Sequence, residues 1–142
     1  MYVVKSVQTE EQLQQAFTIR TKVFVEEQGV PVHLELDEHD KTAHHFIVLD
    51  GEQTIAAARL REYEPTVGKV ERVCVLNEYR GKHLGKLLMD YMEQFARDIG
   101  FEKLKLNAQS YAIPFYEKLQ YVVTSPEFMD AGIPHRAMEK DI

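Results

Sequence analysis

The sequence has few of the features that mark a secreted or membrane-spanning protein. Its 142 residues include a single cysteine, Cys74, which excludes an intrachain disulfide framework and indicates a reducing compartment. No apolar run approaches the roughly 20 residues that a membrane span needs, and the N-terminus lacks a signal-peptide pattern. We therefore expect a cytoplasmic protein that makes no membrane contact.

Positive charge is also in short supply. The chain carries 17 lysine and arginine residues against 23 aspartate and glutamate residues, a formal net charge of −6. This balance argues against a nucleic-acid partner, so any anion site must be local. The sequence also lacks repeats, low-complexity tracts and linkers. Residues 1–142 are therefore expected to form one domain.

The apolar patterns that are present alternate between those of strands and those of helices. Short apolar or alternating runs predict strands near residues 2–7, 46–49, 54–61, 69–76, 103–107, 121–123 and 136–139, the last at an edge. Helical patterns follow the cap residue Thr9 and cover 84–99 and 112–119, whereas 125–134 is expected to form a loop. Strands outnumber helices, which predicts an α+β fold with a mixed sheet.

The most informative stretch is a strand, a turn and a helix between residues 69 and 99. The helix is predicted from apolar residues spaced three and one apart, and Gly100 supplies its stop. That apolar stripe consists of Leu84, Leu87, Leu88, Tyr91, Met92, Phe95, Ala96 and Ile99. Because the first N–H groups of a helix lack intrahelical partners and sit at the positive end of its dipole, they favour an anion.

The turn that enters this helix is basic and glycine-containing. Gly81 and Gly85 permit close approach of a ligand to the backbone, and Arg80, Lys82 and Lys86 add positive charge. The alternative is a solvated turn whose glycines serve geometry alone. The order of apolar strand, basic turn and amphipathic helix favours a site for a phosphorylated ligand.

The segment from Glu71 to Lys86 resembles the acetyl-coenzyme A motif of the GNAT superfamily of N-acetyltransferases, whose core is Arg/Gln-x-x-Gly-x-Gly/Ala. Arg80 and Gly85 match the outer positions, and His83 stands where the first glycine is usual. A helix-entry residue with negative φ needs no glycine, so we expect His83 to enter the helix normally. The resemblance implies a three-layer α/β arrangement: a mixed, mainly antiparallel sheet of about six to seven strands flanked by helices.

The resemblance extends over nearly the whole chain. The opening helix from Arg20 to Pro31, the segments 106–109 and 114–119, and the closing Gly132-Ile133-Pro134-His135 are similar to a bacterial branch that includes small ElaA-like and YjcF-like proteins. One further departure is Gln120, which replaces a glycine and leaves the end of the short helix less relaxed.

The resemblance implies a place for acetyl-CoA in the cleft between the fourth and fifth strands. Backbone groups of Val73, Cys74 and Val75 would pair with the pantetheine arm, and Asn107 would face the gap through which the arm passes. The pyrophosphate would be held by the turn and first helical residues: Arg80, Gly81, Lys82, His83, Leu84, Gly85 and Lys86.

Two residues are candidates for the chemistry. Tyr116 matches a tyrosine that lies near the coenzyme sulfur in the family and serves as general acid; the alternative is that it packs like Phe115. Glu71 is the candidate base or water-positioning residue, or else a partner in an ordinary salt bridge. Strand alternation predicts that Glu71 shares a face with Val73, and Arg72 the opposite face. Glu26, Glu27 and Glu35 are weaker candidates.

The expected activity is acetyl transfer from acetyl-CoA directly to a primary amine, since no cysteine or serine is convincingly activated. The acidic stretch 35–40 would attract a cationic acceptor. A possible homodimer would use an edge strand near the C-terminus. The alternative is a coenzyme A-binding sensor or interaction module without catalysis.

A metal site is the rival from a different class of protein. Its candidate ligands lie within thirteen residues: His33, Glu35, His39, Asp40, His44 and His45. Their spacing matches no closed zinc pattern, and no metal is expected.

Overall fold

The computed structural model describes all residues, Met1–Ile142, and its centre is one eight-stranded sheet. The strand order is β1-β2-β3-β4-β5-β8-β6, with β7 pairing β8 beside this path. The strands are β1 (Tyr2–Ser6), β2 (His44–Asp50), β3 (Gln53–Glu64), β4 (Val67–Val75), β5 (Lys103–Gln109), β6 (Val122–Val123), β7 (Phe128–Asp130) and β8 (Ile133–Asp141). All pairs are antiparallel except β4 with β5. The predicted α+β fold with a mainly antiparallel, mixed sheet is confirmed.

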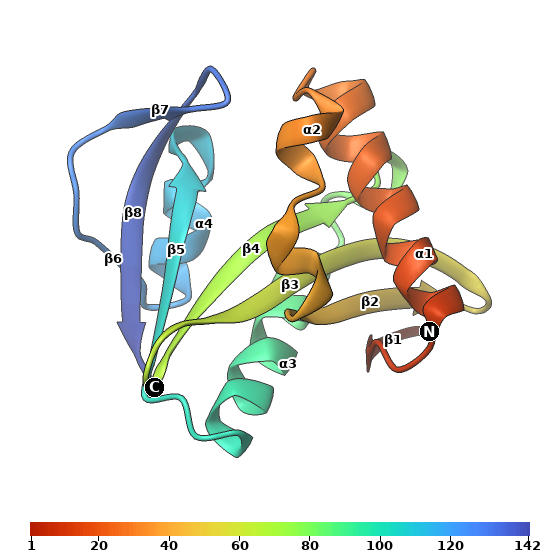
Figure 1. The fold of residues 1–142 in the computed structure, drawn as a ribbon, viewed down its shortest axis with the longest axis horizontal. Coiled ribbons are helices and arrows are strands. Elements are labelled where there is room, and N and C mark those ends of the chain that lie inside the picture. The colour runs from red at the N-terminus through yellow and green to blue at the C-terminus, as the bar shows by residue number, and fades with distance from the viewer.

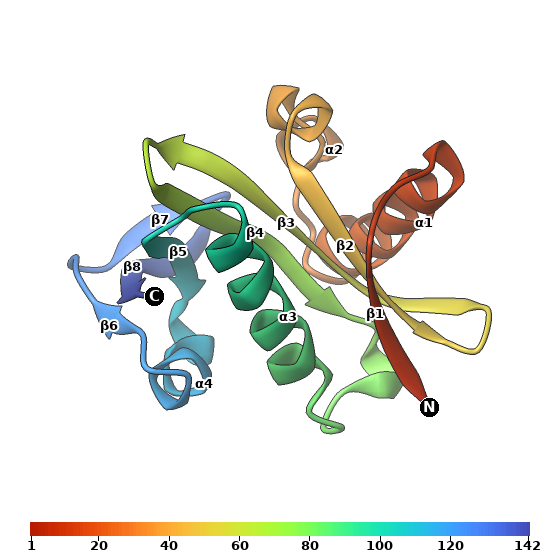
Figure 2. The same ribbon diagram turned by 90° about the horizontal axis from the view of Figure 1, so that it is seen from below.

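Helices cover both faces of this sheet (Figures 1 and 2). Helix α1 (Glu10–Arg20), its π-helical continuation η1 (Thr21–Glu27) and α2 (Val32–Glu35) lie on one face, and α3 (Leu84–Asp98) lies on the other. The remaining helical segments are η2 (Glu38–Lys41), η3 (Asn77–Tyr79), η4 (Ser110–Ala112) and α4 (Ile113–Lys118). The longest helix has 15 residues, and no helix combines the length and apolar character needed to cross a bilayer.

Local sequence explains where the two long helices begin and what they bury. Thr9 caps α1 as predicted, because its hydroxyl accepts a hydrogen bond from the Gln12 backbone N–H at 3.1 Å. The buried stripe of α3 is rotated slightly from the predicted one. Met89 is buried, whereas Leu87 and Tyr91 remain more than a third exposed. The helix therefore packs a narrower apolar stripe against the sheet than the spacing indicated.

The C-terminal strands differ from the prediction. The predicted loop 125–134 contains β7, and β8 is longer than the predicted edge strand and lies between β5 and β6. Strand β8 is fixed by pairing with a distant part of the chain, such as Gln109 with His135, and β7 in turn pairs only with β8; local pattern does not encode the long-range pairing. Gln120 adopts φ +76°, which confirms that the end of the short helix is strained there.

Candidate functional site

The strands β4 and β5 run side by side only at one end. Their parallel register covers three pairs, from Val67–Lys69 with Lys103–Lys105, and the strands then diverge (Figure 1). Beyond Lys69 the β5-facing edge of β4 has no strand partner, although β3 pairs its opposite edge. Unpaired N–H and C=O groups along such an edge can bind an extended chain as an added strand does.

A row of free backbone amides follows the end of β4. None of the N–H groups of Gly81–Lys86 has an acceptor in the turns and loops, and α3, which begins at Leu84, cannot supply one to its own first turn. The first hydrogen bond of the helix runs from Leu87 N–H to His83 C=O at 3.1 Å. The six amides, at the positive end of a 15-residue helix, are free to bind an anion, and we call Gly81–Lys86 the anion-binding turn.

The conformation of this turn corrects one expectation. His83, the residue before the helix, has φ +61° and is left-handed, not the normal helix-entry residue that was predicted. This is the region where glycine costs nothing and other residues are strained, so the usual glycine of the motif has a physical reason here. Gly81 has φ +80° and open space around it, as the turn requires.

The basic side chains of the turn have acidic or aromatic partners. Arg80 donates two hydrogen bonds to the Glu27 carboxylate, at 2.6 and 2.8 Å, and its Nε donates to the Val75 carbonyl at 3.0 Å. Lys86 pairs with Asp90 at 2.6 Å, and Lys82 lies 5.3 Å from the centre of the Tyr79 ring. The Arg80 contact places the anion-binding turn directly beside the end of β4.

Gly85 also brings two helices together. A Cβ built on Gly85 would lie 3.1 Å from Cζ of Phe115 in α4. This distance is tighter than ordinary contact, so the glycine allows the start of α3 to approach the segment that carries Tyr116. The glycine thus links the anion-binding turn to the candidate acid by packing.

A cavity of about 270 Å³ opens where β4 and β5 separate, and it collects four of the predicted site residues, Glu71, Val73, Asn107 and Tyr116. Other lining residues come from η1 and the loop after it, α2, β4, β5, η4, β7 and β8. They include Phe24, Gln28, Val30, Leu34, Glu35, Lys69, Arg72, Gln109, Tyr111, Asp130, Ile133 and His135. Cys74, Val75 and the turn Arg80–Lys86 do not line it. The predicted residues thus divide between this cavity and the anion-binding turn.

Tyr116 presents a hydroxyl with no hydrogen-bond partner in the chain. Its ring packs edge-on against Phe115, at 4.9 Å between centroids, and Tyr121, at 6.0 Å. Burial, with a smaller contribution from Tyr111, raises the pKa of the Tyr116 hydroxyl above its ordinary value. Tyr116 therefore keeps its proton at neutral pH and can donate it to a group bound in the cavity.

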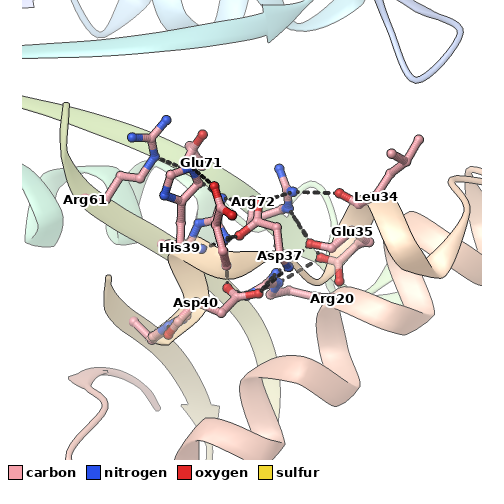
Figure 3. Close-up of polar contacts among 12 residues, drawn as sticks. Arg20, Leu34, Glu35, Asp37, His39, Asp40, Arg61, Glu71 and Arg72 are labelled. Atoms are coloured by element: carbon pink, nitrogen blue, oxygen red, sulfur yellow. Dashed lines mark hydrogen bonds and ion pairs between the residues drawn. The ribbon is translucent and has the colours of Figure 1, made fainter. Parts of the chain in front are cut away.

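On the α1 side of the cavity, two fully buried arginines organise the carboxylates (Figure 3). Arg20 donates to Glu35 at 2.8 Å and to Asp40 at 2.7 Å, and Arg59 donates to Asp40 at 2.8 Å and to Asp37 at 2.7 Å. Burial opposes ionisation of Asp40, yet its hydrogen bonds from both arginines hold its pKa well below the usual range. The acidic stretch 35–40 is thus largely neutralised by arginines and is not a free attractant for cations.

Glu71 belongs to the same ion network. Its Oε1 accepts hydrogen bonds from Arg59 and Arg61, both at 2.8 Å, and its Oε2 lies 3.4 Å from Lys69 Nζ. Burial favours a higher pKa for the Glu71 carboxyl, but Arg59, Arg61 and Lys69 together lower it. The salt-bridge alternative is thus realised in the structure, and the lowered pKa makes Glu71 a weak proton acceptor.

A bulge in β4 changes the predicted alternation of side chains. The register with β3 shifts between the pairs Arg59–Glu71 and Ala57–Cys74, and Arg72 adopts φ +60°. Arg72 then donates to the Glu35 carbonyl at 3.1 Å and to Asp37 at 3.2 Å (Figure 3). Arg59 binds both Asp37 and Glu71, so Glu71 and Arg72 meet the same group of residues. The expectation that Glu71 and Arg72 face opposite sides is wrong, because the bulge adds a residue to the strand.

Cys74 is a buried core residue. Burial raises the pKa of its thiol to about 12, and its Sγ lies 3.7 Å from the Ala57 carbonyl oxygen. A thiol in this setting stays protonated at neutral pH and cannot act as a nucleophile. Only the backbone of Cys74 remains available for ligand binding.

The residues of the metal alternative have other partners. Glu35 and Asp40 pair with Arg20, and the ring of His44 packs against Phe95 at 5.0 Å. His45 lies within 2.9 Å of the Asp40 carbonyl through Nε2. No three metal-ligating side chains in the chain come together as a group.

Sequence reasoning missed several residues in and beside the cavity. Arg59 and Arg20 carried no signal of burial, because an arginine inside a strand or helix pattern usually marks the exposed face. His135 was noticed only as part of a closing motif, although it lines the cavity. A polar residue at an alternate position of a strand, in register with Gln109, is the signal that could have found it.

Comparison with known proteins gives a consistent result. The sequence profile of the acetyltransferase (GNAT) domain matches residues 4–142. The N-acetyltransferase YjcF of Bacillus subtilis, itself uncharacterised, is 46% identical over 133 residues, which is 93% of this chain and 94% of YjcF.

Two crystal structures share the fold over nearly their whole length. An acyl-CoA N-acyltransferase from Pseudomonas aeruginosa has a TM-score of 0.87 at 26% identity, covering 99% of this chain and 98% of the other. Escherichia coli ElaA has a TM-score of 0.89 at 22% identity, with 99% and 100% covered. These matches support an acyltransferase enzyme and not the non-catalytic alternative. The chain belongs to the GNAT acetyltransferase family.

Proposed function

We propose that the protein transfers an acetyl group from acetyl-CoA directly to a primary amine of a small molecule or peptide. The observation that carries the proposal is the continuity of two backbone features. The open edge of β4 ends at Val75, whose carbonyl accepts a hydrogen bond from Arg80, and the free amides Gly81–Lys86 follow after the single turn of η3. One extended, phosphorylated ligand can use both features together.

In this proposal the backbone holds the coenzyme. The edge of β4 at Val73, Cys74 and Val75 pairs with the amides of the pantetheine arm, and the anion-binding turn receives the pyrophosphate. Asn107, on β5 at the opposite wall of the cavity, faces the passing arm. Arg80 and Lys86, both exposed, supply positive charge near the phosphates.

The chemistry requires a neutral amine and a protonated leaving thiolate. The amine nitrogen attacks the thioester carbonyl, the carbon–sulfur bond breaks, and the sulfur takes up a proton. Tyr116 lines the cavity, and its raised pKa keeps its unpartnered hydroxyl protonated, so it donates that proton as general acid. The buried Cys74 thiol supports direct transfer without an acetyl-enzyme intermediate.

Glu71 serves positioning in this scheme. Its Oε1 accepts hydrogen bonds from two arginines, whereas Oε2 has only Lys69 Nζ nearby, at 3.4 Å. Glu71 itself lines the cavity. Oε2 can therefore accept a hydrogen bond from the acceptor amine or from a water beside it. The lowered pKa keeps this oxygen negative without making it the final proton acceptor.

The test is release of free thiol from acetyl-CoA in the presence of a panel of amines: spermidine, kanamycin, L-phenylalanine and a lysine-containing peptide. We expect Tyr116→Phe to lower kcat about 10²- to 10⁴-fold, with acetyl-CoA affinity changed less than twofold. Tyr91→Phe, on the exposed face of α3, is the matched control and should keep full activity. Full turnover by Tyr116→Phe would remove the general acid from the proposal.

A further inference from the structure

One ionisable side chain of the cavity has no role in the scheme above. His135 lies near the start of β8, is 8% exposed and lines the cavity together with Tyr116 and Asn107. Its register partner on β5 is Gln109, which also lines the cavity and lies two residues after Asn107. Since side chains at alternate strand positions share a face, the pairing holds the imidazole on the cavity face of the sheet.

The hydrogen bond of the ring fixes its tautomer. Nδ1 of His135 lies 2.7 Å from the carbonyl oxygen of Ile133, and a carbonyl can only accept a hydrogen bond. Nδ1 must therefore carry the proton, which leaves the neutral ring with a lone pair on Nε2. Nε2 has no partner in the chain and is not among its buried unpartnered polar atoms, so it stays accessible.

Packing holds the ring in this orientation. The imidazole stacks on the Phe128 ring of β7, with 6.0 Å between centroids and 21° between planes. Both neighbours of the ring, the Ile133 carbonyl and Phe128, belong to the β7–β8 hairpin. A fixed tautomer with an accessible nitrogen is the arrangement that a general base requires.

The other charged groups around the cavity are poorly suited to this task. Glu71 is held by three cations, and the second oxygen of Glu35 is buried without a partner and is not solvent-accessible. Lys69 and Arg72 are cations, and Asp130 is an exposed carboxylate on β7. A histidine has an ordinary pKa of about 6.5, closer to neutrality than any carboxylate, and is the better match for a proton leaving an amine.

Resting on the acetyl transfer proposed above, we propose that His135 is the general base, with Nε2 taking the proton of the acceptor amine. As the carbon–nitrogen bond forms, the nitrogen becomes positive and gives its proton to Nε2. The carbon–sulfur bond then breaks, and Tyr116 protonates the departing thiolate. The imidazolium and the tyrosinate return to their starting states by proton exchange with water.

The tautomer is tested without knowledge of the acceptor. In ¹⁵N-labelled protein at pH 7.5, two-bond nitrogen–proton correlations should show the His135 ring protonated at Nδ1 and unprotonated at Nε2. His135→Gln assigns the signals, and His44, exposed on β2, is an internal comparison. A ring protonated at Nε2 would overturn the proposal, because that nitrogen would have no lone pair to accept a proton.

The kinetic arm uses the same thiol-release assay and amine panel. Aniline is added to the panel because its nitrogen is unprotonated near neutral pH. His135→Gln should lower kcat/KM about 10²- to 10⁴-fold and should flatten the acid side of the pH–rate profile measured with aniline. Added imidazole should restore part of the activity of His135→Ala. His44→Gln should behave as the wild type.

The outcomes separate the two proposals. If the wild type does not bind acetyl-CoA, the proposed function fails. If it binds acetyl-CoA and transfers acetyl groups, but His135→Gln matches it in rate and pH profile, the general base is wrong and the transferase stands. A purely structural role of His135 would show as lost coenzyme affinity or altered circular dichroism without rescue by imidazole, and would also overturn the proposal.

Discussion

The two sides of the cleft handle polar groups in opposite ways. On the α1 side, Arg20 and Arg59 are fully buried, and most of their donors are used by Glu35, Asp37, Asp40 and Glu71. On the α3 side, six consecutive backbone amides have no acceptor at all. The α1 side therefore pairs most of its charged atoms within the chain, with Glu35 Oε2 and Arg59 Nε as exceptions, whereas the α3 side leaves a row of backbone donors free for a ligand.

This difference predicts which property each side controls. Changes in the ion network should lower the stability of the fold, because they leave buried charges without partners. Changes to the basic side chains of the turn, Arg80, Lys82 and Lys86, should affect ligand affinity and leave stability nearly unchanged, because these side chains are exposed.

The largest effect is expected for Arg20→Ala. The change leaves Glu35 with only the longer contact to Arg72, at 3.5 Å, and Asp40 with only Arg59, so we expect a loss of about 3–5 kcal/mol in the free energy of unfolding. Urea denaturation followed by circular dichroism measures it. Arg97→Ala, which removes an exposed pair with Glu93 on α3, is the control and should cost under about 0.5 kcal/mol. Equal losses in the two variants would show that burial of the network contributes nothing.

Acid should weaken the fold through the same network. The pKa values of Asp37, Asp40 and Glu71 are all lowered in the folded protein by their arginine partners. The unfolded chain therefore binds protons first, at about pH 4, and the stability present above that pH is lost as the pH falls further. Urea midpoints between pH 7 and pH 3 should decline, and the decline should be smaller in Arg59→Met. A flat profile below pH 4 would contradict the pairing.

A smaller effect is expected in the turn. Arg80→Ala removes the exposed guanidinium between Glu27 and the Val75 carbonyl, and we expect acetyl-CoA affinity to fall about tenfold, or 1.4 kcal/mol. Calorimetric titration at two salt concentrations measures it, since salt should reduce the difference. A large loss of stability in this variant would break the contrast between the two sides.

The smallest effect is expected for His83→Gly. Relief of the left-handed φ of +61° should stabilise the fold by about 0.5–1 kcal/mol, partly offset by the greater freedom of glycine in the unfolded chain. His44→Gly in β2, where the backbone is extended, should instead destabilise it. If both changes lowered the urea midpoint equally, strain at His83 would be excluded.

The same contrast explains what the sequence could predict. The strand, turn and helix between residues 69 and 99 are adjacent in the chain, so their local pattern located the anion-binding turn. The ion network joins residues 10 to 37 positions apart across five elements, and no local pattern reports such contacts. The bulge at Arg72 and the left-handed His83 were missed because both depend on tertiary geometry that overrides backbone preference.

The central claim is that one ligand occupies the edge of β4 and the amides of the turn together. The most direct measurement is an amide ¹H–¹⁵N titration of the protein with acetyl-CoA. We predict that the signals of Gly81–Lys86 and of Val73–Val75 shift in step and saturate at micromolar ligand, about −8 kcal/mol of binding free energy. Saturable binding that moves neither group, or no binding by the folded protein, would contradict the account.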